Sequence, residues 1–180
     1  MINVDISRVE EATNGPSLVP AGGYVTRIIN VENRADKEGL VVELDIADGE
    51  YVGYYEKLNA ERGFWGLSTF RSYKEKALPF FKKFVMSIER SNEGYHWDGD
   101  EEKLIGKLIG AVLQHEEYEA NDGTVKTKVT VNSFDSVQNI LDGKFKVPDK
   151  IILEKANRDN AVVDNSAHSF QPLTDEDTPF

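Results

Sequence analysis

The order of hydrophobic and polar positions along the chain predicts three strands, a helix and then two more strands. Residues 22–34 are rich in β-branched and aromatic side chains, which are typical of strands. In residues 40–46 every second position is Leu, Val or Ile, the period of a half-buried strand. Residues 51–58, with the sequence YVGYYEKL, predict a third strand.

The second half of the pattern begins with a helix at residues 78–92. Leu78, Phe81 and Ile88 recur near one helical face, and Pro79 suits a first helical turn. Two more strands and a final short helix are then predicted at residues 104–119, 124–131 and 135–143. The sequence ANDG at residues 120–123 is a hairpin turn signal between those two strands.

Five short strands with a helix between the third and fourth is the order of an OB-fold. This is a small, partly open barrel whose second and third strands and loops bind oligonucleotides or oligosaccharides. A different five-stranded sheet with one packed helix has a similar periodicity, so both architectures stay open here. The mainly β chain divides into a lead-in segment (1–20), an OB-fold-like domain (21–148) and a flexible acidic tail (149–180). We expect the tail to be disordered because it has no periodicity and many Asn, Asp and Ser residues.

Charge is unevenly distributed along the chain. The formal net charge is −11, yet residues 57–83 hold seven basic residues against two acids. We call this range the basic island; such a local excess can attract phosphate in spite of an acidic total. The chain has no Cys, which fits a reducing cytoplasm, and no apolar run approaches the ~20 residues of a membrane span. We therefore expect a cytoplasmic protein without membrane contact.

Catalytic and metal-binding patterns are missing from the sequence. The segment HEEYE, beginning at His115, has Glu119 where a zinc protease has its second His. The chain contains no phosphate-binding G-x-x-x-x-G-K-[ST] loop and no G-x-S-x-G elbow. We expect no enzymatic activity, no metal site and no cofactor, although scattered carboxylates leave a metal-dependent nuclease open.

Aromatic residues concentrate where the basic residues do. Ten of the eighteen aromatic residues lie between Tyr51 and Phe84. Proteins that bind single strands combine cations for the phosphates with aromatic faces that stack on bases. The candidate nucleic-acid-binding residues are Tyr55, Lys57, Arg62, Trp65, Phe70, Arg71, Tyr73, Lys74, Lys76, Lys107, Lys126 and Lys128.

Several of these candidates also have an ordinary structural explanation. Trp65, Phe70 and Tyr73 can belong to the core instead of a ligand surface. Lys126 and Lys128 share one face of their strand, which either extends a phosphate track or is only solvated.

The segment FRSYKEKALPFFK begins at Phe70 and is the most distinctive of several segments that carry a resemblance. Together these segments resemble a family of small phage and prophage proteins of Gram-positive bacteria, thought to bind single-stranded DNA. The resemblance covers roughly residues 18–145 and the tail, and it implies an OB-type fold and a role in phage DNA replication or recombination. It also implies the cytoplasm of an infected or lysogenic bacterium. The alternative is a phage protein-interaction module that does not bind DNA, and an edge strand could pair with a second copy to form a homodimer.

The last residues, TDEDTPF, resemble the acidic Pro-Phe ending of bacterial single-stranded DNA-binding proteins. There the tail recruits replication and repair enzymes. The resemblance implies that phage or host replication and recombination proteins bind Asp175, Glu176, Asp177, Pro179 and Phe180. An apolar pocket would take the aromatic ring while the acids steer the segment to a basic rim.

Overall fold

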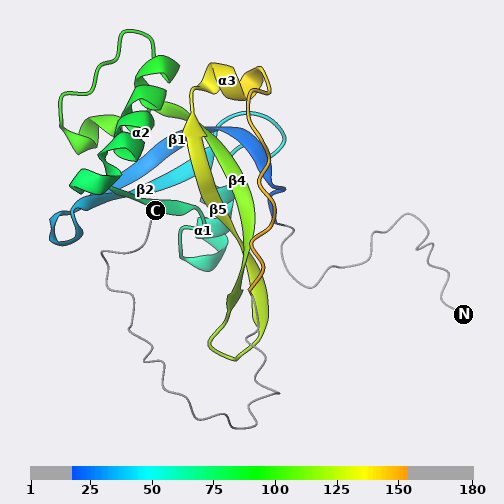
Figure 1. Cartoon of the computed structure of the whole chain (residues 1–180). Helices are drawn as coiled ribbons and strands as arrows, with labels where there is room; N and C mark the ends of the chain where they lie inside the picture. The colour runs from blue at the N-terminus through cyan, green and yellow to red at the C-terminus, as the bar shows by residue number, and fades with distance from the viewer. Residues whose placement is uncertain (1–17, 154–180) are drawn as a thin grey trace, which may run out of the picture.

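The computed structural model describes residues 18–153, which form a mainly β domain with helices packed around one sheet (Figure 1). No helix in this part of the chain is long and apolar enough to cross a membrane. The strands are β1 (Gly22–Arg34), β2 (Gly39–Ile46), β3 (Ser68–Ser72), β4 (Leu108–Glu119) and β5 (Val125–Asp135). The α-helices are α1 (Tyr54–Arg62), α2 (Leu78–Ser91) and α3 (Val137–Leu141), and short 3-10 helices are η1 (Ala35–Lys37), η2 (Glu75–Ala77) and η3 (Glu101–Leu104).

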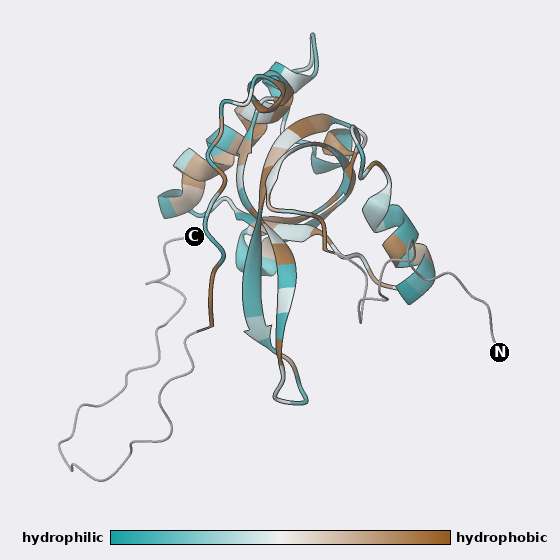
Figure 2. Ribbon diagram, turned by 90° about the vertical axis from the view of Figure 1, so that its right-hand side faces the viewer, coloured by the Kyte–Doolittle hydropathy of each residue, from teal (hydrophilic) through white to brown (hydrophobic). Residues whose placement is uncertain are grey.

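All neighbouring strands are antiparallel, in the order β3-β2-β1-β4-β5. Strand β1 is central because its first half pairs with β4 and its second half with β2. Irregular pairing between Ile28 and Asn30, and between Val112 and Leu113, is of the kind that bends strands. The sheet curls strongly, and its ribbon forms a ring in Figure 2. The edge strands meet where the Arg71 guanidinium lies 4.7 Å from the Phe134 ring centroid.

The core fills the inside of this curl. The alternating residues of β2 are buried as predicted, with Val42 and Leu44 fully enclosed. Helix α2, confirmed between β3 and β4, buries Phe84 and Ile88 against the sheet. The Phe84 ring lies 5.1 Å from the Phe134 ring of β5. Burial of such side chains, worth about 1.5–3 kcal/mol each, holds the helix on the curled sheet.

The predicted third strand at residues 51–58 is wrong, because most of this segment belongs to helix α1. Its sequence has strand-type tyrosines, but Gly49 and Gly53 have φ of 88° and 70° and turn the chain after β2. The Asp45 carboxylate of β2 then accepts hydrogen bonds from the amides of Tyr55 (3.0 Å) and Glu56 (3.2 Å). A side chain from the preceding strand therefore supplies the cap that α1 lacks at its own N-cap position.

The actual third strand is β3, five residues that carry no clear alternation. The predicted strand at 104–119 also begins later, at Leu108, because η3 and a turn with Gly106 at φ 83° precede it. The predicted hairpin between β4 and β5 and the short helix α3 are confirmed.

Both ends of the described chain lie against the domain. Val19, in the predicted lead-in segment, is completely buried, and its carbonyl oxygen is 2.8 Å from His115 Nε2. Ile151 forms a parallel bridge with Glu116 on the edge of β4 that β1 leaves free. Lys150 Nζ lies 2.6 Å from Glu117 Oε1, and this hydrogen bond lowers the pKa of the Glu117 carboxyl. The chain thus leaves the domain along β4.

Candidate nucleic-acid interface

The outer face of β1, β2 and β3 is formed by the residues that alternate with the buried ones. One cross-strand row on this face contains Glu32, Val41 and Phe70, and the next contains Asn30, Glu43 and Ser68. The face therefore combines an exposed aromatic ring with two carboxylates, one of which, Glu32, forms an ion pair with Arg34 at 3.4 Å. It has no excess of cations.

Phe70 is the exposed aromatic residue of that face, with 41% of its surface accessible. Its ring lies against the backbone of β2, since a Cβ added to Gly39 would be 2.1 Å from Phe70 Cζ. Gly39 leaves room for the ring to lie across the strand, with much of the ring open to solvent. This geometry suits a platform on which a base or another flat group can stack.

Arg71 follows Phe70 in the sequence but points to the opposite face, towards the inside of the curled sheet. One terminal nitrogen donates to Thr69 Oγ1 at 2.7 Å, whereas its buried Nε has no acceptor among the described residues. Burial lowers the pKa of the guanidinium to about 10, because desolvation disfavours the charged form. Arg71 and Phe70 therefore cannot act on the same face of β3.

Tyr55, a predicted ligand residue, is only 2% exposed and belongs to the core. Its hydroxyl has no partner in the described part of the chain, and burial raises its pKa. The structure corrects this prediction, because a ring buried in the core has no free face for a base. The neighbouring tyrosines Tyr51 and Tyr54 are only half-buried and pack edge-to-face, their centroids 6.4 Å apart.

Trp65 and Tyr73 are half-buried and held in place by hydrogen bonds. The Trp65 indole donates to the Leu44 carbonyl oxygen at 2.9 Å, and the Tyr73 hydroxyl donates to Asn33 at 3.0 Å. The Tyr73 ring also packs edge-to-face on Phe81, at 5.9 Å. Both side chains are therefore largely structural.

The β4–β5 hairpin projects beyond the rest of the sheet as an arm (Figure 1). On one face of this arm Tyr118 is paired with Lys126, and Glu116 with Lys128. The Lys128 ammonium lies 5.6 Å from the Tyr118 ring centroid and 3.7 Å from Glu116 Oε1. Sequence reasoning did not select Tyr118, which is 37% exposed. Counting outward from the predicted 120–123 turn would pair it with Val125, and only the observed register places it opposite Lys126.

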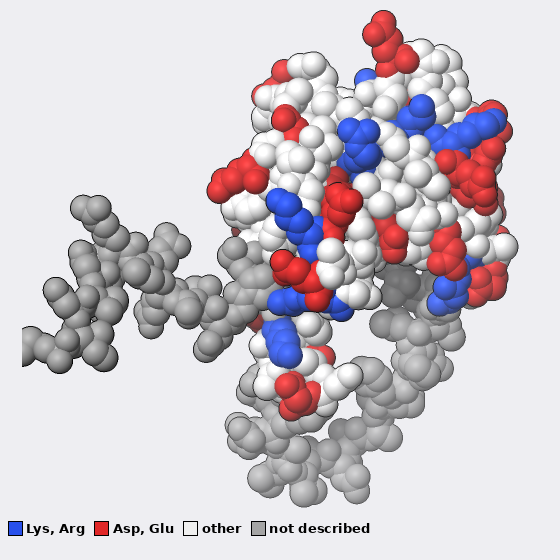
Figure 3. All heavy atoms as spheres, turned by 180° about the vertical axis from the view of Figure 1, so that it is seen from behind, with Lys and Arg blue, Asp and Glu red and all other residues white. Residues whose placement is uncertain are grey.

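The other predicted cations are spread over the surface. Lys57 and Arg62 lie on α1 and Lys74 and Lys76 at η2, while Lys107 lies 4.3 Å from the Tyr95 ring centroid. No cation of the basic island forms an ion pair with another residue of the described range 18–153. Seen from behind, Lys and Arg alternate with Asp and Glu and form no continuous basic patch (Figure 3).

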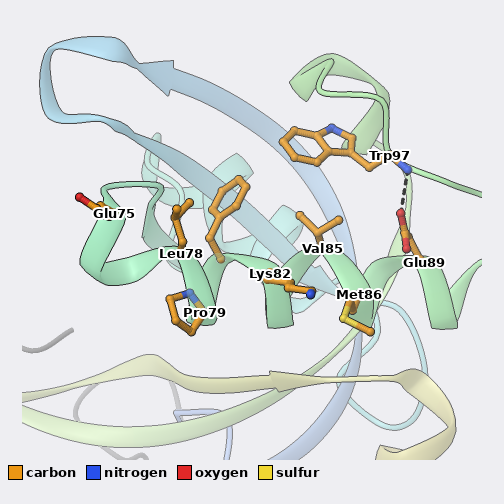
Figure 4. Close-up of a pocket in the computed structure, with 9 residues that line it drawn as sticks. Glu75, Leu78, Pro79, Lys82, Val85, Met86, Glu89 and Trp97 are labelled. Carbon is orange, nitrogen blue, oxygen red and sulfur yellow. Dashed lines mark hydrogen bonds between the residues drawn. The ribbon is translucent and has the colours of Figure 1, made fainter.

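A separate feature, a shallow apolar groove, runs along the outer side of α2 (Figure 4). It has a volume of about 790 Å³. The Trp97 ring forms one wall, held by hydrogen bonds from its indole to the Asp100 carbonyl oxygen and from its backbone amide to Glu89. We call this the α2 groove; its lining residues are Glu75, Leu78, Pro79, Phe81, Lys82, Val85, Met86, Glu89 and Trp97.

The predicted partner-binding residues Asp175, Glu176, Asp177, Pro179 and Phe180 lie outside the described residues. Comparison of the chain with protein-family models and with curated proteins found no match.

Proposed function

We propose that the protein is an OB-fold-like single-stranded DNA-binding protein with weak sequence selectivity. The strand order β3-β2-β1-β4-β5, with α2 between β3 and β4, agrees with the topology of that fold. OB-folds bind oligonucleotides on the face of strands 2 and 3 and on the loops beside it. The observation that carries the proposal is that both places have an exposed aromatic residue here, Phe70 on β3 and Tyr118 on the β4–β5 arm.

Binding would combine stacking with phosphate contacts. Phe70 and Tyr118 offer ring faces that accept any base, while Lys126 and Lys128 supply positive charge next to Tyr118. Glu43 opposes this attraction, because it lies one row from Phe70 and forms no ion pair within the described range. The unpaired Glu43 favours a mode in which bases stack on β3 while the phosphates turn towards lysines at its margins.

A role in phage DNA replication or recombination follows as part of the same proposal. It is supported by the family resemblance of the sequence and by the acidic segment that ends in Pro179 and Phe180. In this role the protein covers single strands while its C-terminal segment recruits replication or recombination enzymes.

Fluorescence anisotropy with a labelled oligo-dT tests the proposal. Phe70→Ala and Tyr118→Ala should each weaken binding at least about fivefold, because stacking on one base contributes ~1–3 kcal/mol. Phe80→Ala is the matched control, since Phe80 is 58% exposed on α2 and lies on neither surface. Glu43→Gln should tighten binding about two- to fivefold, as removing one unfavourable surface charge typically contributes under ~1 kcal/mol.

The same assay across a salt series gives the decisive result. Affinity for the single strand should fall steeply with salt as phosphate contacts release counterions. Preference for duplex, absence of binding at low salt, or equal effects of Phe70→Ala and Phe80→Ala would each refute the proposal.

A protein-interaction module without DNA binding is the second candidate function. The α2 groove favours it, because an apolar surface with a few charged residues at its rim suits a peptide or protein partner. A defined partner that binds through the groove, together with no oligonucleotide affinity, would select this alternative.

A further inference from the structure

The α2 groove has walls that are formed before any ligand arrives. The Trp97 ring packs on Phe81 with centroids 5.6 Å apart, and its two hydrogen bonds fix its orientation. Val85 points from α2 towards this ring, while Met86 lies with Pro79 and Lys82 along the other side of the lining (Figure 4). A rigid apolar site of this kind binds a matching side chain without a large cost of ordering the protein.

Charge around the groove is mixed, because one cation and two acids line it. The wider segment 74–90 holds five cations against the same two acids. Lys82 lies in the lining without an ion pair in the described range, whereas Glu89 is bound to the Trp97 amide and lies 4.0 Å from His96. Glu75, at one end of the groove, is the remaining carboxylate. A ligand with acids next to one apolar ring would match the Lys82 side of this site.

One segment of the chain outside the described residues has this chemistry. Residues 1–17 contain no aromatic residue at all. Residues 154–180 contain Phe170, which has no adjacent acid, and Phe180, which closely follows three acids and Pro179. The segment 174–180 therefore combines the charge and the ring that the groove fits.

The connection is long enough to reach any part of the domain. Twenty-seven residues follow Leu153, and at ~3.3–3.6 Å per residue they span up to about 90 Å. A compact domain the size of the described part has a radius of gyration of about 14 Å. Tethering of this kind typically supplies an effective concentration on the order of 1 mM, so even a weak site becomes occupied.

We propose that the α2 groove binds the chain's own segment 174–180, with the Phe180 ring against Trp97 and Val85 and the acids near Lys82. While it is docked, this segment is withheld from other proteins. The inference goes beyond DNA binding and does not depend on it.

The full-length chain carries its own probes for this contact. Met86 is one of two methionines, and Trp97 is one of two tryptophans. Carbon-13 labelling of Met methyl groups therefore gives a signal inside the groove, and the indole N–H spectrum gives one groove signal with Trp65 as internal reference. Phe180→Ala should move the Met86 and Trp97 signals and leave Trp65 unchanged, while the matched control Phe170→Ala should move none of them.

Addition of the free peptide TDEDTPF to the Phe180→Ala protein should return the Met86 and Trp97 signals to their wild-type positions. The Kd of the peptide should be below about 1 mM, because the tethered segment fills the groove only if its Kd is below its effective concentration. A peptide with Ala in place of its Phe should have no effect. Lys82→Glu should lower the affinity for the peptide about two- to fivefold, as expected for one exposed ion pair. Lys57→Glu reverses the charge of another unpaired lysine, away from the groove, and should leave the affinity unchanged.

Three results would overturn the proposal. The first is that the Met86 and Trp97 signals shift neither with Phe180→Ala nor with the added peptide. The second is an equal response to Phe170→Ala. The third is a wild-type spectrum that shifts with protein concentration, because this would assign the occupant to a second copy of the chain.

Discussion

Removal of the Asp45 carboxylate should unfold helix α1 from the sheet and destabilise the whole domain. Asp45 is 5% exposed, and its two oxygens accept hydrogen bonds from the amides of Ile46 (2.8 Å), Tyr55 (3.0 Å) and Glu56 (3.2 Å). Helix α1 has no side-chain cap of its own, since Gly53 occupies the position before it. Asp45→Ala therefore leaves three amide groups without an acceptor in one step.

The magnitude follows from these contacts. Loss of a helix cap costs about 0.5–2 kcal/mol, and each hydrogen bond to a charged group contributes about 1.5–3 kcal/mol. The first turn of α1 can fray and let water reach the two helical amides, which recovers part of this loss. We expect a decrease of about 2–4 kcal/mol in the free energy of unfolding, near the upper end of effects of single substitutions.

Urea unfolding followed by tryptophan fluorescence measures this change. With a urea dependence of about 2 kcal/mol per molar, the midpoint should fall by about 1–2 M. Asp48→Ala is the matched control, because Asp48 lies exposed in the turn that follows and accepts no hydrogen bond shown within the described range. If Asp45→Ala changed stability by no more than Asp48→Ala, the proposed capping of α1 would be refuted.

Three further substitutions test the packing. Gly110→Ala places a Cβ 2.4 Å from Ile140 Cγ1 and 2.9 Å from two backbone oxygens. Calorimetry should therefore show a decrease of about 1–3 kcal/mol in the free energy of unfolding, and an unchanged melting temperature would contradict this. Arg71→Met keeps the packing and removes a desolvated charge. Urea unfolding at pH 7 should therefore show a free energy of unfolding that is unchanged or raised by up to roughly 3 kcal/mol. A decrease of more than about 1 kcal/mol would contradict this expectation. The folded pKa of Arg71 is lowered, so the unfolded chain binds more protons from about pH 10 upward, and the advantage of Arg71→Met should shrink over that range. Tyr55→Phe removes a buried hydroxyl that has no hydrogen-bond partner among the described residues. Unfolding curves should show a free energy of unfolding equal to or above that of the wild type. A clear decrease would mean that the hydroxyl does form a hydrogen bond.

Much of the fold could be predicted because its signals are local. Helix α2 and strand β2 have clear periods of 3.6 and 2, and the hairpin between β4 and β5 is marked by its turn residues. The pattern failed between residues 51 and 72. There Tyr54 and Tyr55 have strand propensity, but Asp45 and the two glycines direct the chain into α1. Strand β3 was missed because five residues are too few to show a period.

The candidate site depended more on the tertiary structure. Composition alone indicated a mixture of aromatic and basic residues in the basic island. Only the register of β3 on β2 shows that Phe70 faces outward and Arg71 inward, and only the β4–β5 pairing places Tyr118 beside two lysines.

The amphipathic segments and the distribution of charge can be recognised from the order of residues alone. Which aromatic rings have a free face depends on how the strands and helices pack. This packing buries Tyr55, exposes Phe70 over Gly39 and brings Trp97 across a loop to form a wall beside α2. The physical reason is that periodicity is a property of neighbours in the sequence, whereas exposure depends on contacts between residues far apart in it. No local pattern contains those contacts.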